Sequence, residues 1–119
     1  IDYIQERKIF DQPVGKYQNT RFKIAEMMTE IRSLRAFIDD CTRLLSAGDL
    51  DTVTASMAKL KATELQGDII DDCLQFFGGY GYMREFPISR AFVDARVQRI
   101  YGGTSEVMKE IIARDILGR

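Results

Sequence analysis

The residues of this sequence that could serve chemistry gather around two clusters of glycine. The first is the stretch QFFGGYGYMREFP, residues 75–87, and the second is IYGGTSE, residues 100–106. Glycine lets a ligand approach backbone N–H groups, and such groups at a turn or at the start of a helix bind a phosphate, a ribose or a carbonyl. The alternative is that Gly78 merely ends a helix and the rest is a tight link. Neither cluster has the spacing of a dinucleotide-binding turn or a P-loop.

The other reactive side chains offer little. Histidine, the commonest general base and metal ligand, is absent. Cys41 and Cys73 fall on apolar helical positions, where we expect buried free thiols rather than a disulfide or a zinc site. The acidic pairs at 39–40 and 71–72 are typical of solvated helix faces. Arg7 is either a surface charge or a clamp for an anion.

Composition bounds the protein class. A chain of 119 residues with 45% apolar and 29% charged residues is typical of one globular domain. The net charge of −1 argues against a nucleic-acid surface. No apolar run approaches the roughly 20 residues that a membrane span needs. The chain begins with Ile1 and shows no signal peptide, so we expect a piece of a longer protein.

Apolar periodicity predicts helices throughout. Residues 1–9 read as the tail of a helix that Pro13 and Gly15 terminate. A long helix is expected from Tyr17 to about Ala47, because apolar residues recur at spacings of three and four. They are Ile24, Met27, Ile31, Leu34, Ile38, Cys41 and Leu45. Gly48 should end this helix, and Asp49 or Asp51 should cap the next.

The helix expected over 50–77 has two apolar stripes, which indicates that it lies centrally or meets another subunit. A shorter helix should run from Pro87 to about Ile100, and Thr104 or Ser105 should cap a last helix. In that last helix Val107, Ile111 and Ile112 are expected to face inward. No strand pattern competes. The sequence therefore predicts an all-α, up-and-down bundle of long antiparallel helices plus a shorter pair, in a single domain over 1–119.

Taken together, the motifs resemble the C-terminal domain of acyl-CoA dehydrogenases over essentially the whole chain, in order and at family-like spacing. The matching pieces are Arg7-Lys8-x-Phe10, Gln18, Gln75-x-x-Gly78-Gly79-x-Gly81-Tyr82, Pro87, Asp94-Ala95-Arg96, Ile100-Tyr101-x-Gly103-Thr104-Ser105-Glu106 and Ile112-Ala113-Arg114. The likeness is greatest to the long-chain type. It implies a flavoenzyme that removes two hydrogens from the Cα–Cβ bond of an acyl-CoA. Its helical N-terminal and β middle domains would lie outside this chain.

The resemblance also implies roles for individual residues. Those expected to bind FAD are Arg7, Phe10, Gln18, Gln75, Gly78, Gly79, Thr104, Ser105 and Glu106. Those expected to line the acyl-thioester site are Tyr101, Gly102 and Gly103. Further implications are a homo-oligomer (dimer or tetramer), an electron-transfer flavoprotein as acceptor, and a location in the bacterial cytoplasm or the mitochondrial matrix. Asp11 stands where the family usually has glycine, which leaves the loop geometry near Arg7 open.

Gly102 occupies the position at which many members carry their catalytic glutamate, so no catalytic residue is assigned in this chain. One explanation is a glutamate on an earlier helix, before Ile1, as in the long-chain and isovaleryl types. The other is a paralogue that has lost its base and serves as a helical oligomerisation module. An acyl-CoA oxidase-type flavoenzyme is a further alternative.

Overall fold

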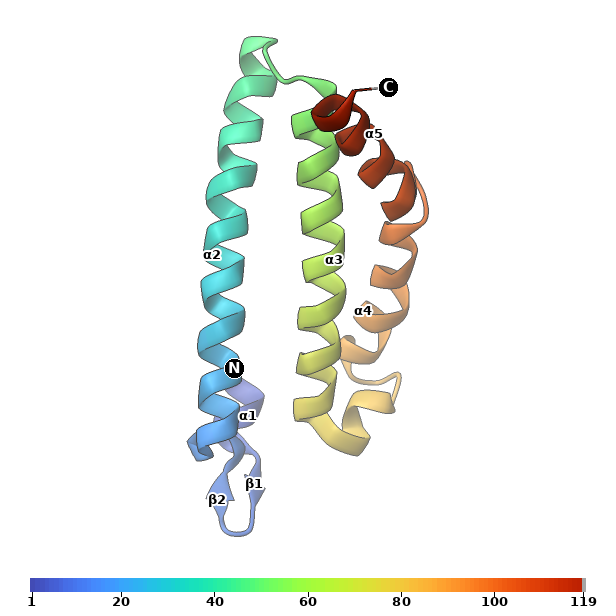
Figure 1. Ribbon diagram of the computed structural model, residues 1–119. Helices are drawn as coiled ribbons and strands as arrows, with labels where there is room; N and C mark the ends of the chain where they lie inside the picture. Colours follow the sequence, from blue (N-terminus) through green and yellow to red (C-terminus); the bar gives the residue numbers. More distant parts are fainter. Residues whose placement is uncertain (119) are drawn as a thin grey trace.

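The computed structural model describes residues 1–118, and its architecture is the all-α, up-and-down arrangement that the periodicity predicts (Figure 1). The α-helices are α1 (Asp2–Glu6), α2 (Gln18–Ala47), α3 (Thr52–Phe77), α4 (Pro87–Arg96) and α5 (Ser105–Leu117). Short 3₁₀ turns occupy Val14–Lys16, Gly78–Tyr82 and Val97–Arg99. None of the helices over residues 1–118 combines the length and apolarity that crossing a bilayer requires.

The two long helices begin and end where local chemistry requires. Gly48 ends α2 with φ of 81°, a left-handed conformation that costs a residue with a Cβ energy. Asp51 caps α3, because its carboxylate accepts the N–H groups of Val53 and Thr54 at 2.8 Å. The Thr54 hydroxyl and these N–H groups hold the pKa of the Asp51 carboxyl below its ordinary value. Pro87 is the first residue of α4, as predicted.

Helix α3 is central, as its two apolar stripes indicate. It packs against α2 on one side and against α4 and α5 on the other (Figure 1). The buried residues of α3 are Ser56, Ala58 and Leu65. Met27 and Cys41 are the buried members of the α2 stripe, and Met108 is the buried anchor of α5. Cys41 and Cys73 are both free thiols.

The apolar faces are only partly enclosed. The Cα radius of gyration is 17.6 Å, whereas a compact chain of this length has one of roughly 13.5 Å. Leu45, at the end of the predicted α2 stripe, is 66% exposed. Apolar grooves follow the α2–α3 seam and are lined by Ile24, Met27, Ile31, Leu34, Ile38, Leu65, Ile69 and Phe76. Such continuous apolar surface is typical of a unit that packs against further protein.

The N-terminal segment contains a strand pair that the sequence reading did not predict. Helix α1 ends at Glu6 rather than near Ile9, and β1 (Lys8–Ile9) pairs antiparallel with β2 (Gln12–Pro13). Each strand is too short to show alternation. The hairpin tip is Phe10-Asp11, with φ of 48° and 63°. Positive φ at both central residues is the geometry of a type I′ turn, which Asp tolerates better than most residues.

The inward face of α5 also differs from the prediction. Val107 is 47% exposed, while Ser105 and Met108 are buried. Ile111 and Ile112 are half-buried. The helix thus turns the side that carries Ser105 and Met108 toward the core, and Thr104 is its N-cap.

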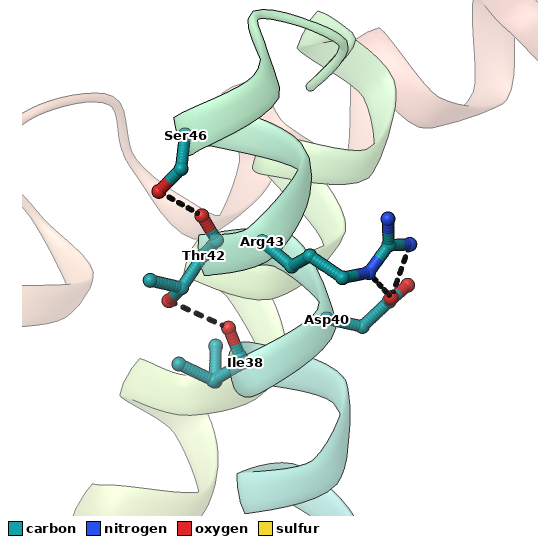
Figure 2. Close-up of polar contacts among 5 residues, drawn as sticks. All are labelled: Ile38, Asp40, Thr42, Arg43 and Ser46. Carbon is teal, nitrogen blue, oxygen red and sulfur yellow. Dashed lines mark hydrogen bonds and ion pairs between the residues drawn. The ribbon is translucent and has the colours of Figure 1, made fainter.

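Near the C-terminal end of α2, the polar side chains contact groups of the same helix. Figure 2 shows Thr42 donating to the Ile38 carbonyl at 2.8 Å and Ser46 donating to the Thr42 carbonyl at 2.9 Å. Beside them Arg43 forms an ion pair with Asp40. These contacts are all local and exposed, so this part of α2 offers no preorganised ligand site.

Candidate functional site

Arg7 joins the first glycine cluster, from the opposite end of the sequence. Its Nη1 donates to the carbonyl oxygen of Phe77 at 2.6 Å and to the hydroxyl of Tyr3 at 2.5 Å. A Cβ added to Gly78 would lie 3.3 Å from Nη2 of Arg7. The guanidinium therefore rests on the last turn of α3, where the negative end of the helix dipole favours a cation. This contact brings together two residues that the resemblance assigned to one cofactor.

Aromatic rings hold this arrangement in place. Tyr3 stacks on Phe77, with ring centroids 3.9 Å apart and planes 12° apart. Phe86 meets Phe77 edge-on, and the Arg7 guanidinium lies 5.6 Å from the ring centroids of both Tyr3 and Tyr80. Arg7 is half-buried. Stacked, charge-assisted contacts of this kind fix the direction of a guanidinium while leaving donors for an anion.

The remaining residues of this first group are exposed. Phe10 projects from the hairpin tip and is 91% exposed, which is unusual for phenylalanine. Gln18 is the first residue of α2, and Gln75 lies in the last turn of α3; both side chains are exposed, as is Gly79. The hairpin, the start of α2 and the end of α3 all lie at the lower end of the bundle in Figure 1.

The second group forms the turn between α4 and α5. Gly102 and Gly103 have φ of 62° and 97°. A Cβ on Gly103 would collide with the terminal methyl of Met108, whereas a Cβ on Gly102 would meet nothing within 4 Å. The Met108 methyl is the end of a flexible side chain and can shift, so it is the φ of 97° that favours glycine at 103, and Gly102 faces open space. The backbone N–H groups of 102, 103 and 104 take part in none of the hydrogen bonds found within residues 1–118.

The start of α5 adds polar groups to this turn. Thr104 Oγ1 accepts the N–H of Val107 at 3.3 Å. The Ser105 side chain is only 3% exposed, and its hydroxyl has no hydrogen-bond partner within the described chain. The backbone N–H of Glu106 and the hydroxyl of Thr104 hold the pKa of the Glu106 carboxyl below its ordinary value. Unused N–H groups, a helix N-terminus and a buried hydroxyl without a partner together indicate a ligand site.

Two residues of this region were missed by sequence reasoning. Lys59 Nζ donates to the Gly103 carbonyl at 2.5 Å. Glu64 forms ion pairs with Arg99 at 3.7 Å and with Lys109 at 3.2 Å. In the sequence, Lys59 could have been noticed because it is a charged residue between Ala58 and Leu60 on a helix with two apolar stripes.

The chain thus forms two groups rather than one site. Arg7, Phe10, Gln18, Gln75, Gly78 and Gly79 gather at the lower end of the bundle, and the turn at 101–106 lies higher, beside α4 and α5 (Figure 1). Within residues 1–118 no three acidic or thiol side chains gather as metal ligands would.

Comparison with known proteins gives the family of the chain. The profile described as "Acyl-CoA dehydrogenase, C-terminal domain" matches residues 1–117. The chain belongs to the acyl-CoA dehydrogenase family. Membership of this family implies a flavin cofactor.

Two relatives and one solved structure show how similar the chain is to individual members. The chain is 51% identical to the mitochondrial long-chain specific acyl-CoA dehydrogenase of Sus scrofa over 98% of its own length. It is 38% identical to a 3-(aryl)acrylate reductase of Clostridium sporogenes, again over 98% of its length. The crystal structure of an acyl-CoA dehydrogenase from Geobacillus kaustophilus superposes with a TM-score of 0.95 at 40% identity, over 98% of this chain and 30% of that one.

This acyl-CoA dehydrogenase domain matches less than a third of the length of these relatives. It spans 27% of the pig enzyme and 31% of the Clostridium reductase. The resemblance to the family, and to its long-chain type, is confirmed.

Proposed function

We propose that this chain is the C-terminal FAD-binding and oligomerisation domain of an acyl-CoA dehydrogenase that acts in fatty acid β-oxidation. The observation that carries the proposal is the turn at 102–105. It combines three N–H groups without internal partners, a helix N-terminus and the buried hydroxyl of Ser105. The identity of 51% to a long-chain enzyme supports that subclass.

The residues present fit an FAD shared between two subunits. One subunit would supply the Arg7 guanidinium to the pyrophosphate, with Phe10 and Gln18 beside it and the stretch from Gln75 to Gly79 along the adenosine. The other subunit would supply Thr104, Ser105 and Glu106. The separation of these groups in Figure 1 supports a shared cofactor, because the residues assigned to FAD fall at two different places in the fold.

Tyr101, Gly102 and Gly103 would line the acyl-thioester. A proton leaves Cα more readily when donors stabilise the charge that develops on the thioester oxygen, and one such donor is worth about 3 kcal/mol in related acyl chemistry. The N–H of Gly102 is suited to this task because its φ of 62° opens the turn and a Cβ there would meet nothing within 4 Å. The bound flavin supplies the acceptor for the hydride from Cβ.

The base that takes the proton is not in this chain under this proposal. Position 102 carries no side chain, histidine is absent, and Glu106 is assigned to the contact with FAD. We place the base on a helix that precedes Ile1 in the whole protein. The isolated bundle is therefore expected to be inactive.

Assembly belongs to the same proposal. The exposed apolar grooves along α2 and α3 and the elongated shape support packing against further protein, in a homodimer or homotetramer of the whole enzyme. An electron-transfer flavoprotein would accept the electrons. The enzyme would be cytoplasmic in a bacterium and mitochondrial in a eukaryote.

Phe10 offers a clean test of the FAD site, since a side chain that is 91% exposed contributes little to the fold of its own chain. In the whole protein, Phe10→Ala should raise the FAD dissociation constant about tenfold without lowering the melting temperature of the apoprotein. The control is Leu45→Ala, which removes another exposed apolar side chain at the opposite end of α2. Equal FAD affinity in the two variants would contradict the assignment.

A further inference from the structure

Lys59 reaches the glycine turn from the central helix. Its Nζ donates a 2.5 Å hydrogen bond to the carbonyl oxygen of Gly103, which lies 44 positions later in the chain. The lysine side chain is half-buried beside the buried Ala58. A charge-assisted bond in such surroundings is stronger than an exposed neutral one and fixes the direction of the carbonyl.

The direction of this carbonyl sets the direction of a neighbouring donor. The peptide unit that joins Gly103 to Thr104 is trans, since no cis bond occurs among the described residues. In a trans peptide the C=O and the N–H point to opposite sides. Because the Gly103 oxygen points at Lys59 on α3, the N–H of Thr104 points away from α3. That N–H is among the three that no hydrogen bond within residues 1–118 uses.

The same bond strengthens the donor. A hydrogen bond accepted by the C=O of a peptide unit polarises the unit and makes its N–H a better donor. The positive charge of Lys59 adds to the dipole at the start of α5. We infer that Lys59 is a positioning residue, which aims and strengthens the Thr104 N–H toward an acceptor atom of the ligand held at the turn. This inference rests on the proposed function and adds a residue to it.

Glu64 shows that α3 braces the turn from both sides. Its carboxylate pairs with Arg99, which precedes the turn, and with Lys109 on α5, which follows it. Those pairs hold the flanking elements, whereas among residues 1–118 Lys59 is the residue of α3 whose side chain hydrogen-bonds to the backbone of the turn itself. Removing the Lys59 ammonium should therefore loosen one peptide unit without undocking α4 or α5.

The test uses three variants of the whole protein: Lys59→Met, Lys59→Arg and Lys61→Met. Lys61 is the matched control, because it lies on the same helix and pairs with Glu30 at 2.9 Å on the exposed side. The first readout is amide hydrogen exchange of a peptide covering residues 100–108, in which the N–H groups of Val107 and Met108 are protected by bonds to Thr104. We expect exchange about tenfold faster in Lys59→Met, a smaller change in Lys59→Arg, and a rate near wild type in Lys61→Met.

The second readout separates the two possible acceptors. If the acceptor belongs to FAD, Lys59→Met should raise the FAD dissociation constant about tenfold; if it belongs to the thioester, the flavin should be reduced by acyl-CoA about tenfold more slowly at full FAD occupancy. Whichever effect is found should appear at an unchanged melting temperature. Unchanged exchange, or FAD affinity and reduction rate equal to those of Lys61→Met, would overturn the inference. A wild-type flavin that no acyl-CoA reduces would contradict the proposed function and leave the exchange result standing.

Discussion

The guanidinium of Arg7 lies directly over Gly78, so close that a Cβ at position 78 would stand 3.3 Å from Nη2. The guanidinium is also held in place, because its Nη1 donates to both the Phe77 carbonyl and the Tyr3 hydroxyl. Glycine at position 78 thus allows both the positive φ of the backbone and the close approach of Arg7. Two segments that are 70 positions apart are locked by this contact.

Gly78→Ala should destabilise the whole protein by about 1–3 kcal/mol. The backbone has φ of 59° there, which L residues rarely adopt, and the new methyl group would press on Arg7. Denaturant unfolding measures the effect. Gly67→Ala is the control: no atom lies within 4 Å of its added Cβ, and alanine within a helix should stabilise by about 0.5–1 kcal/mol. Loss of stability in both variants would show that the strain at 78 is not the cause.

The hairpin tip should respond to Asp11 according to backbone preference. Asp11 has φ of 63°, so Asp11→Gly should leave stability unchanged or raise it by at most about 1 kcal/mol. Asp11→Val should lower stability, because a β-branched residue is strained at positive φ. Thermal unfolding of the whole protein compares the two. Equal melting temperatures for the glycine and valine variants would contradict the turn geometry.

Gly102→Val tests the open side of the second turn. Valine is strained at φ of 62°, and its side chain would enter the space that we assign to the thioester. We expect flavin reduction by acyl-CoA to slow by at least roughly tenfold while FAD remains bound. The control is Val107→Ala, a change at a half-exposed position on the same helix start. Unchanged kinetics for Gly102→Val would contradict the placement of the thioester beside this turn.

Asp51 should make stability depend on pH in a defined direction. Its pKa in the folded chain is lowered, chiefly by the Thr54 hydroxyl and then by the Thr54 N–H. The stabilisation is therefore fully present above the unfolded pKa, about 3.9, and is lost as the pH falls through the lower folded value. The melting temperature of Asp51→Ala should lie below wild type at pH 7, and the gap should shrink below pH 4. Asp49→Ala serves as the control for loss of a nearby carboxylate.

Three helix boundaries were predictable because their causes are local, whereas α1 and α4 end earlier than predicted, at Glu6 and Arg96. Gly48, Asp51 and Pro87 act through their own backbone and their immediate neighbours, and the structure uses all three as the sequence indicates. The β1–β2 hairpin was not predictable by alternation, since its strands are two residues each. Its turn, Phe10-Asp11, also lacks the glycine that marks most such turns.

The site was predictable as motifs but not as geometry. The two glycine clusters stand out in sequence, yet the contact between Arg7 and Phe77 depends on how α1 folds back onto α3. Lys59 carries no motif and becomes significant only when α3 passes the Gly103 carbonyl. The exposed Val107 was misassigned because periodicity alone cannot say which of two apolar faces of α5 meets α3.

The most direct test of the proposed activity is anaerobic reduction of the flavin. The whole protein is loaded with FAD, acyl-CoA thioesters of graded chain length are added without oxygen, and the visible flavin band is followed. We predict bleaching, fastest with long chains, which would place a working base outside residues 1–119. A flavin that binds but is not bleached by any acyl-CoA would contradict the account and leave the bundle as an assembly domain of a protein without dehydrogenase activity.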